Sequence, residues 1–160
     1  MRHAKLCYKD IHYNAKGAVM QLHTAADLMT PAPLTVTADA SLHDAHALMR
    51  EHNIRHIPVT DEHGTLIGML TQKLMIAQVM RIISVFGAPA LERKEKQTQV
   101  GDIMLQDFDT VAPGDALSDI AQFFLNNRHG CMPVVEEQKL LGILTSSDFV
   151  RLSVELLKKS

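Results

Sequence analysis

The sequence holds few of the features that mark disulfide bonding, membrane insertion or secretion. Cys7 and Cys131 are its only cysteines in 160 residues, so we expect no structural disulfide and a reducing, cytoplasmic setting. The net charge of −2 gives no bias toward nucleic acid or a membrane surface. No apolar run approaches the ~20 residues of a membrane-spanning helix. The basic residues near the N-terminus have no apolar segment behind them, so we expect no secretory signal.

The motifs of common catalytic and metal sites are missing as well. Neither Cys131 nor any serine lies in a nucleophile elbow, and no G-x-x-x-x-G-K-[ST] phosphate loop occurs. His43 and His46 share a helical face, and His52 and His56 follow them, yet no cysteine or carboxylate cluster lies nearby in the sequence. We therefore predict exposed helical histidines, no metal site, no enzyme activity, and Cys131 as a small buried hydrophobe.

What the chain does contain is an internal repeat. Residues 24–60 reappear 75 positions later, and a one-residue deletion in the following turn then changes the offset to 74. Each copy has roughly 55–60 residues, a size at which one core is marginal, so we expect the copies to bury a face against each other. The identical pairs include Asp27/Asp102, Met29/Met104, Thr35/Thr110, Val36/Val111, Leu42/Leu117, Pro58/Pro133, Val59/Val134, Leu66/Leu140, Gly68/Gly142, Leu70/Leu144 and Thr71/Thr145.

The repeat also divides the chain. We assign residues 22–86 to the first copy and 98–160 to the second. Residues 87–97 are polar and punctuated by Gly and Pro, which predicts a linker. Residues 1–21 lie outside the repeat and form an N-terminal arm, a candidate for disorder, to which we assign no role.

Each copy has the same predicted order of elements. Capping boxes at 24–27 and 41–44 predict helix starts, and alternating apolar residues predict hairpins. The first copy is predicted to hold a short helix at 24–29, an extended piece at 34–36, a helix from 42, strands at 57–60 and 65–71, and a helix to about 86. The second holds the corresponding elements at 100–104, 109–111, 116–127, 132–135, 140–145 and 146–158. Each copy is thus β-α-β-β-α, and the fold class is α+β.

This pattern resembles a tandem pair of CBS (cystathionine β-synthase) domains over residues 22–158. The resemblance rests on Asp27-Leu-Met-Thr30, Thr35-Val36, Ile57-Pro58-Val59 and Gly68-Met-Leu-Thr71, and on Asp102-Ile-Met104, Thr110-Val111, Met132-Pro133-Val134 and Gly142-Ile-Leu-Thr145-Ser-Ser-Asp148. It implies two β-α-β-β-α motifs packed through their sheets about a pseudo-twofold axis, with a cleft on each side. It also implies a sensor whose clefts take AMP, ADP, ATP or S-adenosylmethionine, with no required cofactor.

Only the second copy keeps the family's ligand motif G-h-x-[T/S]-x-x-[D/N], at residues 142–148. The resemblance implies that Asp148 holds the ribose hydroxyls and that Thr145 assists at the ribose and phosphate. Ser146 and Ser147 lie at a helix N-terminus, where free N–H groups and the helix dipole favour an anion. The alternative is that Asp148 only caps its helix.

The first copy has Leu74 where the motif needs the acid. Leucine offers no hydrogen bond to a diol, and an unpaired buried hydroxyl costs roughly 1–3 kcal/mol. We therefore expect one competent cleft per chain, the first being empty or binding something different.

Further ligand contacts are implied by alignment with the family. Asp109 and Thr110 align with its first strand, near the ribose or phosphate. His129, Met132 and Pro133 align with the segment that meets the adenine and phosphate. For these residues an ordinary solvated surface is the alternative.

The function we predict from the sequence is a stand-alone regulatory module that binds an adenosyl nucleotide between its motifs and signals to an unidentified protein in trans. The alternative is an interaction or assembly module with no physiological small-molecule ligand. A homodimer is expected, because the helix after each hairpin carries an apolar stripe and such helices commonly form the family's dimer interface. The stripes are Leu74, Met75, Val79, Met80 and Ile83, and Phe149, Val150, Leu152 and Leu156. Packing in the chain's own core is the default interpretation of such a stripe.

Overall fold

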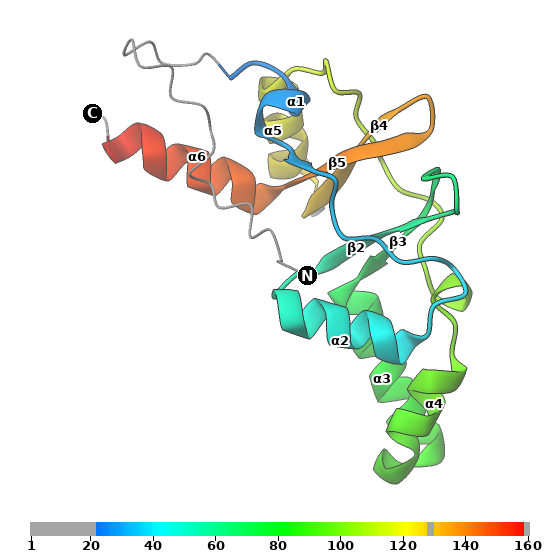
Figure 1. Ribbon diagram of the computed structural model, residues 1–160. Coiled ribbons are helices and arrows are strands. Elements are labelled where there is room, and N and C mark those ends of the chain that lie inside the picture. The colour runs from blue at the N-terminus through cyan, green and yellow to red at the C-terminus, as the bar shows by residue number, and fades with distance from the viewer. Residues whose placement is uncertain (1–21, 128–129, 159–160) are drawn as a thin grey trace.

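Two antiparallel sheets organise the fold, one for each copy of the repeat (Figure 1). The computed structural model describes residues 22–127 and 130–158. One sheet pairs β2 (His56–Thr60) with β3 (Leu66–Thr71), and the other has the order β1 (Thr30–Pro31), β5 (Lys139–Thr145) and β4 (Cys131–Glu136). The predicted hairpins of both copies are therefore confirmed.

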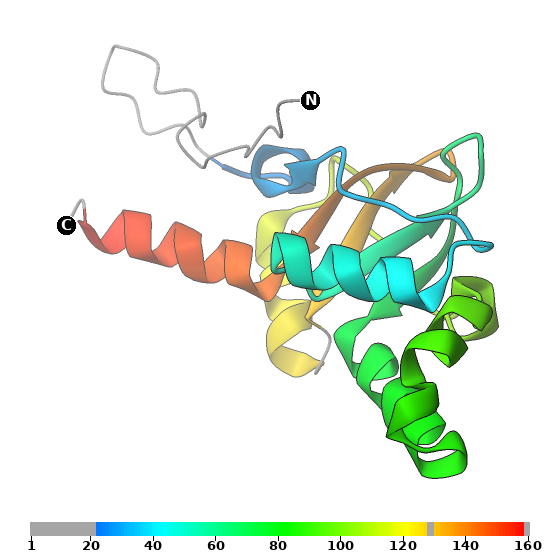
Figure 2. The same cartoon turned by 60° about the horizontal axis from the view of Figure 1, so that its bottom comes forward.

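Helices flank the two sheets. They are α1 (Ala25–Leu28), α2 (Leu42–His52), α3 (Gln72–Phe86), the 3₁₀ helix η2 (Ala88–Ala90), α4 (Leu91–Gln97), the 3₁₀ helix η3 (Val100–Asp102), α5 (Leu117–Asn126) and α6 (Ser146–Lys158). Helices α2, α3 and α4 gather beside β2 and β3, whereas α1, α5 and α6 gather beside β4 and β5 (Figure 1). Figure 2 shows α6 extending away from the other elements, while α3 has α4 beside it.

Side-chain hydrogen bonds cap the N-termini of α1 and α2, as the sequence predicted. Asp27 accepts a hydrogen bond from the N–H of Thr24 at 2.8 Å, closing the capping box at α1. The hydroxyl of Ser41 accepts from the N–H of Asp44 at 3.1 Å at the start of α2. These bonds satisfy N–H groups that have no partner within a helix.

The N-terminal segment of each copy pairs with the hairpin of the other copy. Thr30 pairs with Ile143 on β5, and Leu105 pairs with Met69 on β3. Adding 75 to residue 30 gives 105, and subtracting 74 from residue 143 gives 69, so the two pairings are related by the repeat. The exchange is therefore reciprocal, as a pseudo-twofold relation between the copies requires.

Each hydrophobic core also contains residues of the other copy. Val100 from the second copy is fully buried in the core of the first, among Leu42, Ile57 and Leu70. The core of the second copy takes in Ala25 from the first copy. Neither core is complete without residues from the other copy.

The repeated glycine of the motif is explained by this exchange. A Cβ atom at Gly142 would collide with the side chain of Met29 and lie 2.9 Å from the carbonyl oxygen of Thr30. A Cβ atom at Gly68 would collide with Met104 in the same way. The glycine in each hairpin therefore makes room for the methionine of the other copy's exchanged segment.

The extended pieces predicted at 34–36 and 109–111 do not become full strands. Each forms one parallel bridge, Val36 with Val59 and Val111 with Val134. The short helix predicted at 100–104 is a single 3₁₀ turn, Val100–Asp102. Such short elements depend on tertiary contacts more than on local preference.

The predicted linker is helical and packs on the first copy. Helix α4 contacts both α2 and α3, and it places Glu95 in a site where the residue is only 5% exposed. Nδ1 of His46 lies 2.9 Å from Oε1 of Glu95, and Nδ1 of His43 lies 3.9 Å from Oε2. The carboxylate that the sequence did not place near these histidines comes from 49 positions away.

None of the described helices is by itself long and apolar enough to cross a bilayer. Helix α3 together with residues 88–97 has the length and composition of a broken span, but the two parts meet at 118°.

Candidate functional site

The first turn of α6 holds the acid of the complete ligand motif. Asp148 is only 5% exposed, an unusual burial for a carboxylate. Its Oδ2 atom accepts hydrogen bonds from the backbone N–H of Thr145 at 2.7 Å and from the Thr145 hydroxyl at 2.8 Å. Asp148 therefore caps its own helix, and its contact with a ribose stays a prediction.

The second oxygen of Asp148 is less fully engaged. Oδ1 lies 3.4 Å from Nη1 of Arg151, one turn along α6. A carboxylate has about four lone-pair sites, so capping leaves acceptor capacity on Oδ1. Arg151 was not predicted from the sequence, although its i, i+3 spacing from Asp148 on a helix would have indicated it.

The start of α6 is also tied to the segment that precedes β4. The N–H of Ser146 donates to the carbonyl oxygen of Gly130 at 3.2 Å. Cys131 follows Gly130, and its thiol is free and half-buried. Burial and the nearby negative charge of Asp148 raise the pKa of Cys131 to about 12. A thiol so hard to ionise is a poor nucleophile, which agrees with a packing role for this residue.

Two of the other predicted residues lie on a neighbouring exposed segment. Asp109 and Thr110 are exposed. The next residue, Val111, donates its N–H to the carbonyl oxygen of Pro133 at 3.0 Å, which attaches this segment to β4. The fold thus brings residues 109–110 beside β4, which pairs with the strand leading into Asp148.

The remaining predicted residues differ in their surroundings. Ser146 and Ser147 are exposed at the start of α6. Met132 and Pro133 are buried, and Met132 belongs to the core of the second copy, so its contact with an adenine stays a prediction. His129 lies outside the described residues.

The equivalent position in the first copy is built differently. There the hydroxyl of Thr71 accepts a hydrogen bond from the N–H of Leu74 at 3.2 Å and caps α3. Leu74 packs against the first core. The two helix starts are thus capped by opposite means, a hydroxyl in the first copy and a carboxylate in the second.

Two motifs that exchange segments, with an acid at only one of the two equivalent helix starts, define a tandem α+β module. The chain belongs to the CBS domain family: the family model for the CBS domain matches it twice, over residues 25–81 and 100–155.

Similar proteins include relatives of comparable length and longer ones. The chain is 27% identical over 127 residues to the CBS domain-containing protein YhcV of Bacillus subtilis, covering 79% of this chain and 83% of YhcV. Other relatives are longer, and the chain spans only 41% of an uncharacterized protein of Methanocaldococcus jannaschii.

Solved structures with bound ligands are similar to the chain over most of its length. The structure of CBSX2 in complex with AMP has 29% identity and a TM-score of 0.68, covering 84% of this chain and 98% of CBSX2. The CBS domain pair of protein MJ0100, in complex with 5′-methylthioadenosine and S-adenosyl-L-methionine, has 26% identity and a TM-score of 0.65, covering 82% and 96%.

Proposed function

We propose that this CBS pair is a regulatory module that binds one adenosyl nucleotide in the cleft of the second copy. The observation that carries the proposal is Asp148, a buried carboxylate in a complete ligand motif with one oxygen left for a further donor. Relatives of the same architecture in complex with AMP, and with methylthioadenosine and S-adenosylmethionine, support an adenosyl ligand.

Recognition of the nucleotide would follow from the chemistry of the α6 start. The ribose diol would donate to Oδ1 of Asp148, displacing the long contact with Arg151. The exposed Ser146 and Ser147 offer hydroxyl groups, and the N-terminus of this 13-residue helix favours the phosphate of AMP, ADP or ATP. Thr110 and Asp109 would contribute from the segment beside β4, and His129 from the segment that precedes it.

The signal would pass through the relation between the copies. A ligand changes an equilibrium only if it binds one arrangement more tightly than another. Because each copy's core includes the other's N-terminal segment, a shift at the second-copy cleft is transmitted to the first. A protein partner in trans, in the cytoplasm, would read the altered shape.

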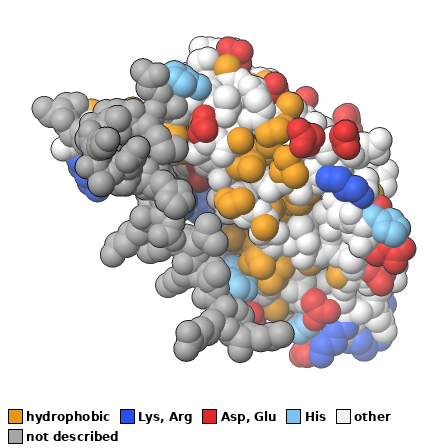
Figure 3. Space-filling view, turned by 45° about the horizontal axis from the view of Figure 1, so that its top comes forward, with side chains coloured by type: hydrophobic (Ala, Val, Ile, Leu, Met, Phe, Trp, Pro, Cys, Tyr) orange, Lys and Arg blue, Asp and Glu red, His pale blue; other side chains and the backbone are white. Residues whose placement is uncertain are grey.

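A second chain is part of the proposal. Helix α3 exposes Ile76, Met80, Val85 and Phe86 by 56%, 62%, 65% and 52%, and α6 exposes Val150 and Val154 by 63% and 44%. Of the predicted stripes, Leu74, Met75, Phe149 and Leu152 pack in the chain's own two cores instead. The apolar groups that remain exposed on the two helices are typical of a homodimer interface. Acidic and basic side chains are interspersed around hydrophobic ones on another face (Figure 3), so no single-sign field favours nucleic acid there.

Calorimetric titration with AMP, ADP, ATP and S-adenosylmethionine tests the nucleotide site. We expect saturable binding of one ligand per chain, and Asp148→Ala should weaken it by about 100-fold, since up to two charge-assisted hydrogen bonds are lost. Asp27→Ala is the matched control, because Asp27 accepts the same bonds from the N–H and hydroxyl of Thr24 but lies in α1.

Two results would contradict the proposal. If none of the four ligands binds, the chain is better described as an interaction or assembly module without a small-molecule ligand. If Asp148→Ala and Asp27→Ala weaken binding equally, the effect belongs to helix capping and not to ligand contact.

A further inference from the structure

A polar hollow lies away from Asp148, on the side of the first copy. It has a volume of about 420 Å³ and is lined by Gln78 and Arg81 of α3, Gln97 and Thr98 at the end of α4, and Asp102 and Ile103 in and after η3. Small-molecule sites commonly occupy roughly 300–1,000 Å³. The hollow is therefore large enough for a compact metabolite.

The charged groups that line the hollow are unpaired. Arg81, Asp102 and Gln97 are exposed to solvent, and Gln78 is half-buried. Within the described part of the chain, the side chains of Arg81 and Asp102 make no ion pair with each other or with any other group, and neither side chain forms a hydrogen bond. The amide side chains of Gln78 and Gln97 also lack hydrogen-bond partners among these residues. One cation, one anion and two amides thus face a common space without satisfying one another.

The repeat shows that this arrangement is not required by the fold. Asp27, the counterpart of Asp102, caps its own helix through Oδ2, which accepts from the N–H of Thr24 at 2.8 Å and from its hydroxyl at 2.9 Å. In the second copy, Gln99 stands where Thr24 stands in the first, and η3 has no side-chain cap. The carboxylate of Asp102 is therefore released from the structural role of its counterpart.

Gln78 and Gln97 also differ from their counterparts in the other copy, which are apolar. Residues 78 and 97 correspond to Leu152 and Leu22 by the repeat offsets of 74 and 75. Both leucines pack against the second core, so on that side the equivalent space is used for apolar packing. On the first-copy side, polar residues occupy these positions and border a hollow.

We propose that the hollow binds a free α-amino acid, with its carboxylate against Arg81 and its ammonium group against Asp102. Charge-assisted hydrogen bonds, such as those of a guanidinium with a carboxylate, are stronger than neutral ones. A free amino acid carries both a carboxylate for Arg81 and an ammonium group for Asp102. Gln78 and Gln97 would hydrogen-bond a polar side chain, and Ile103 supplies an apolar wall. The site is separate from the nucleotide cleft and does not rest on it.

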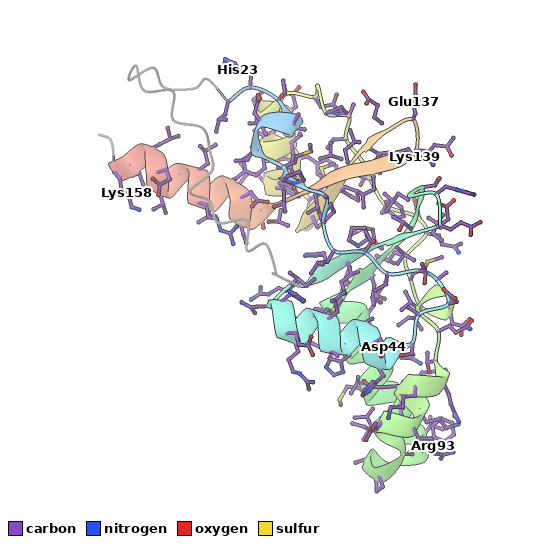
Figure 4. All side chains as sticks on the ribbon, in the orientation of Figure 1. His23, Asp44, Arg93, Glu137, Lys139 and Lys158 are labelled. Carbon is purple, nitrogen blue, oxygen red and sulfur yellow. The ribbon has the colours of Figure 1, made fainter. Side chains whose placement is uncertain are left out.

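Titration of the full chain with glycine, L-glutamate and L-glutamine, followed by calorimetry, tests the site. At least one of the three should bind saturably. Arg81→Gln and Asp102→Asn should each weaken that binding at least about tenfold, as the loss of a charge-assisted hydrogen bond does. Arg93→Gln on α4 (Figure 4) removes a comparable exposed charge outside the hollow and should leave binding unchanged.

A second variant separates ligand binding from folding. Gln78→Leu combined with Gln97→Leu gives the hollow the residues of its counterpart, so the chain should remain folded by circular dichroism while amino-acid binding is lost. Asp148→Ala should leave amino-acid binding intact. Absence of saturable binding by all three amino acids would overturn the proposal, as would equal binding by the Arg81→Gln and Arg93→Gln variants.

Discussion

The two copies share a framework and differ in the chemistry placed on it. Gly68 and Gly142 both make room for a methionine of the other copy, and most positions of one core have an apolar counterpart in the other. The equivalent polar positions differ between the copies. Leu74 is the counterpart of Asp148, and the capping Asp27 is the counterpart of the unpaired Asp102. Residues that hold the copies together are thus repeated, whereas residues that face solvent or ligand are free to diverge.

The difference indicates a division of labour within one chain. The second copy carries the acid of the ligand motif at the start of α6. The polar hollow lies beside the first copy, where the linker helix α4 contacts α2 and α3. If both proposed sites bind their ligands, positions that are equivalent in the repeat have separate roles.

The largest effect is expected at the proposed dimer interface. Met80→Glu on α3 and Val154→Glu on α6 place a charge on side chains that are 62% and 44% exposed in the single chain. Burying an unpaired charge is costly, so each substitution should raise the dimer dissociation constant at least about 100-fold. Sedimentation analysis over a range of concentrations measures this constant. An unchanged constant for one variant would restrict the interface to the other copy.

A smaller loss is expected from filling the space between the copies. Gly142→Ala and Gly68→Ala should each lower the free energy of unfolding by about 2–3 kcal/mol, because Met29 or Met104 and a backbone carbonyl must move. Gly114→Ala is the control, since a Cβ atom there meets nothing within 4 Å. Urea unfolding measures all three, and equal stability of the three variants would contradict the close approach.

Restoring the acid to the first copy should narrow the difference between the clefts. Leu74→Asp is expected to add a second nucleotide site, raising the calorimetric stoichiometry from one per chain to two, with a gain of about tenfold in first-cleft affinity. Leu74→Asn keeps the shape without the charge and should gain less. A stoichiometry that stays at one would show that the first cleft lacks more than the acid.

The pH dependence of stability should differ between His56 and Cys131, which occupy equivalent positions. Burial and the charge of Arg55 lower the pKa of His56, so the unfolded chain binds more protons and stability is lost as the pH falls below about 6.5. Burial and Asp148 raise the pKa of Cys131 to about 12, so stability is lost as the pH rises above about 8.5.

Unfolding measured from pH 5 to 10 separates these two limbs. His56→Gln should flatten the acid limb, and Cys131→Ala should flatten the alkaline limb. If either variant leaves its limb unchanged, the corresponding group does not control it.

The smallest effect is expected at the turns. Glu137 lies at the turn between β4 and β5 (Figure 4). Glu137 and Gln138 have positive φ angles of 48° and 68°, whereas the first copy has Gly64 at 78°. Gln138→Gly should therefore stabilise the protein by about 0.5–1 kcal/mol. Glu136→Gly, in β4, should destabilise it instead. Thermal unfolding measures both, and a loss of stability in Gln138→Gly would contradict strain at this turn.

Much of the fold follows from local pattern and from the repeat. The boundaries of α3 and α6 and both hairpins agree with the periodicity of their apolar residues. The exchange of Thr30 and Leu105 between sheets does not, because a two-residue strand has no periodicity to detect. The same holds for Glu95, whose burial against His46 joins segments far apart in sequence.

The candidate site shows the same limit. The motif indicated Thr145 and Asp148, and the structure joins them by two hydrogen bonds. The motif did not indicate that the carboxylate of Asp102 makes no capping hydrogen bond. That difference arises because Gln99 occupies the position that Thr24 has in the first copy. Only the two copies in three dimensions make that absence visible.

The reciprocal exchange of N-terminal segments has a consequence for how such a chain could arise. A polypeptide with a single copy would lack the turn that fills its own core, as the first core here lacks Val100 until the second copy supplies it. Two identical single-copy chains would each complete the other, as domain-swapped dimers do. Joining them through residues such as 87–97 would convert an association that depends on concentration into an intramolecular one. After gene fusion, the surface of each half could change independently, but each half would still need the other to complete its core.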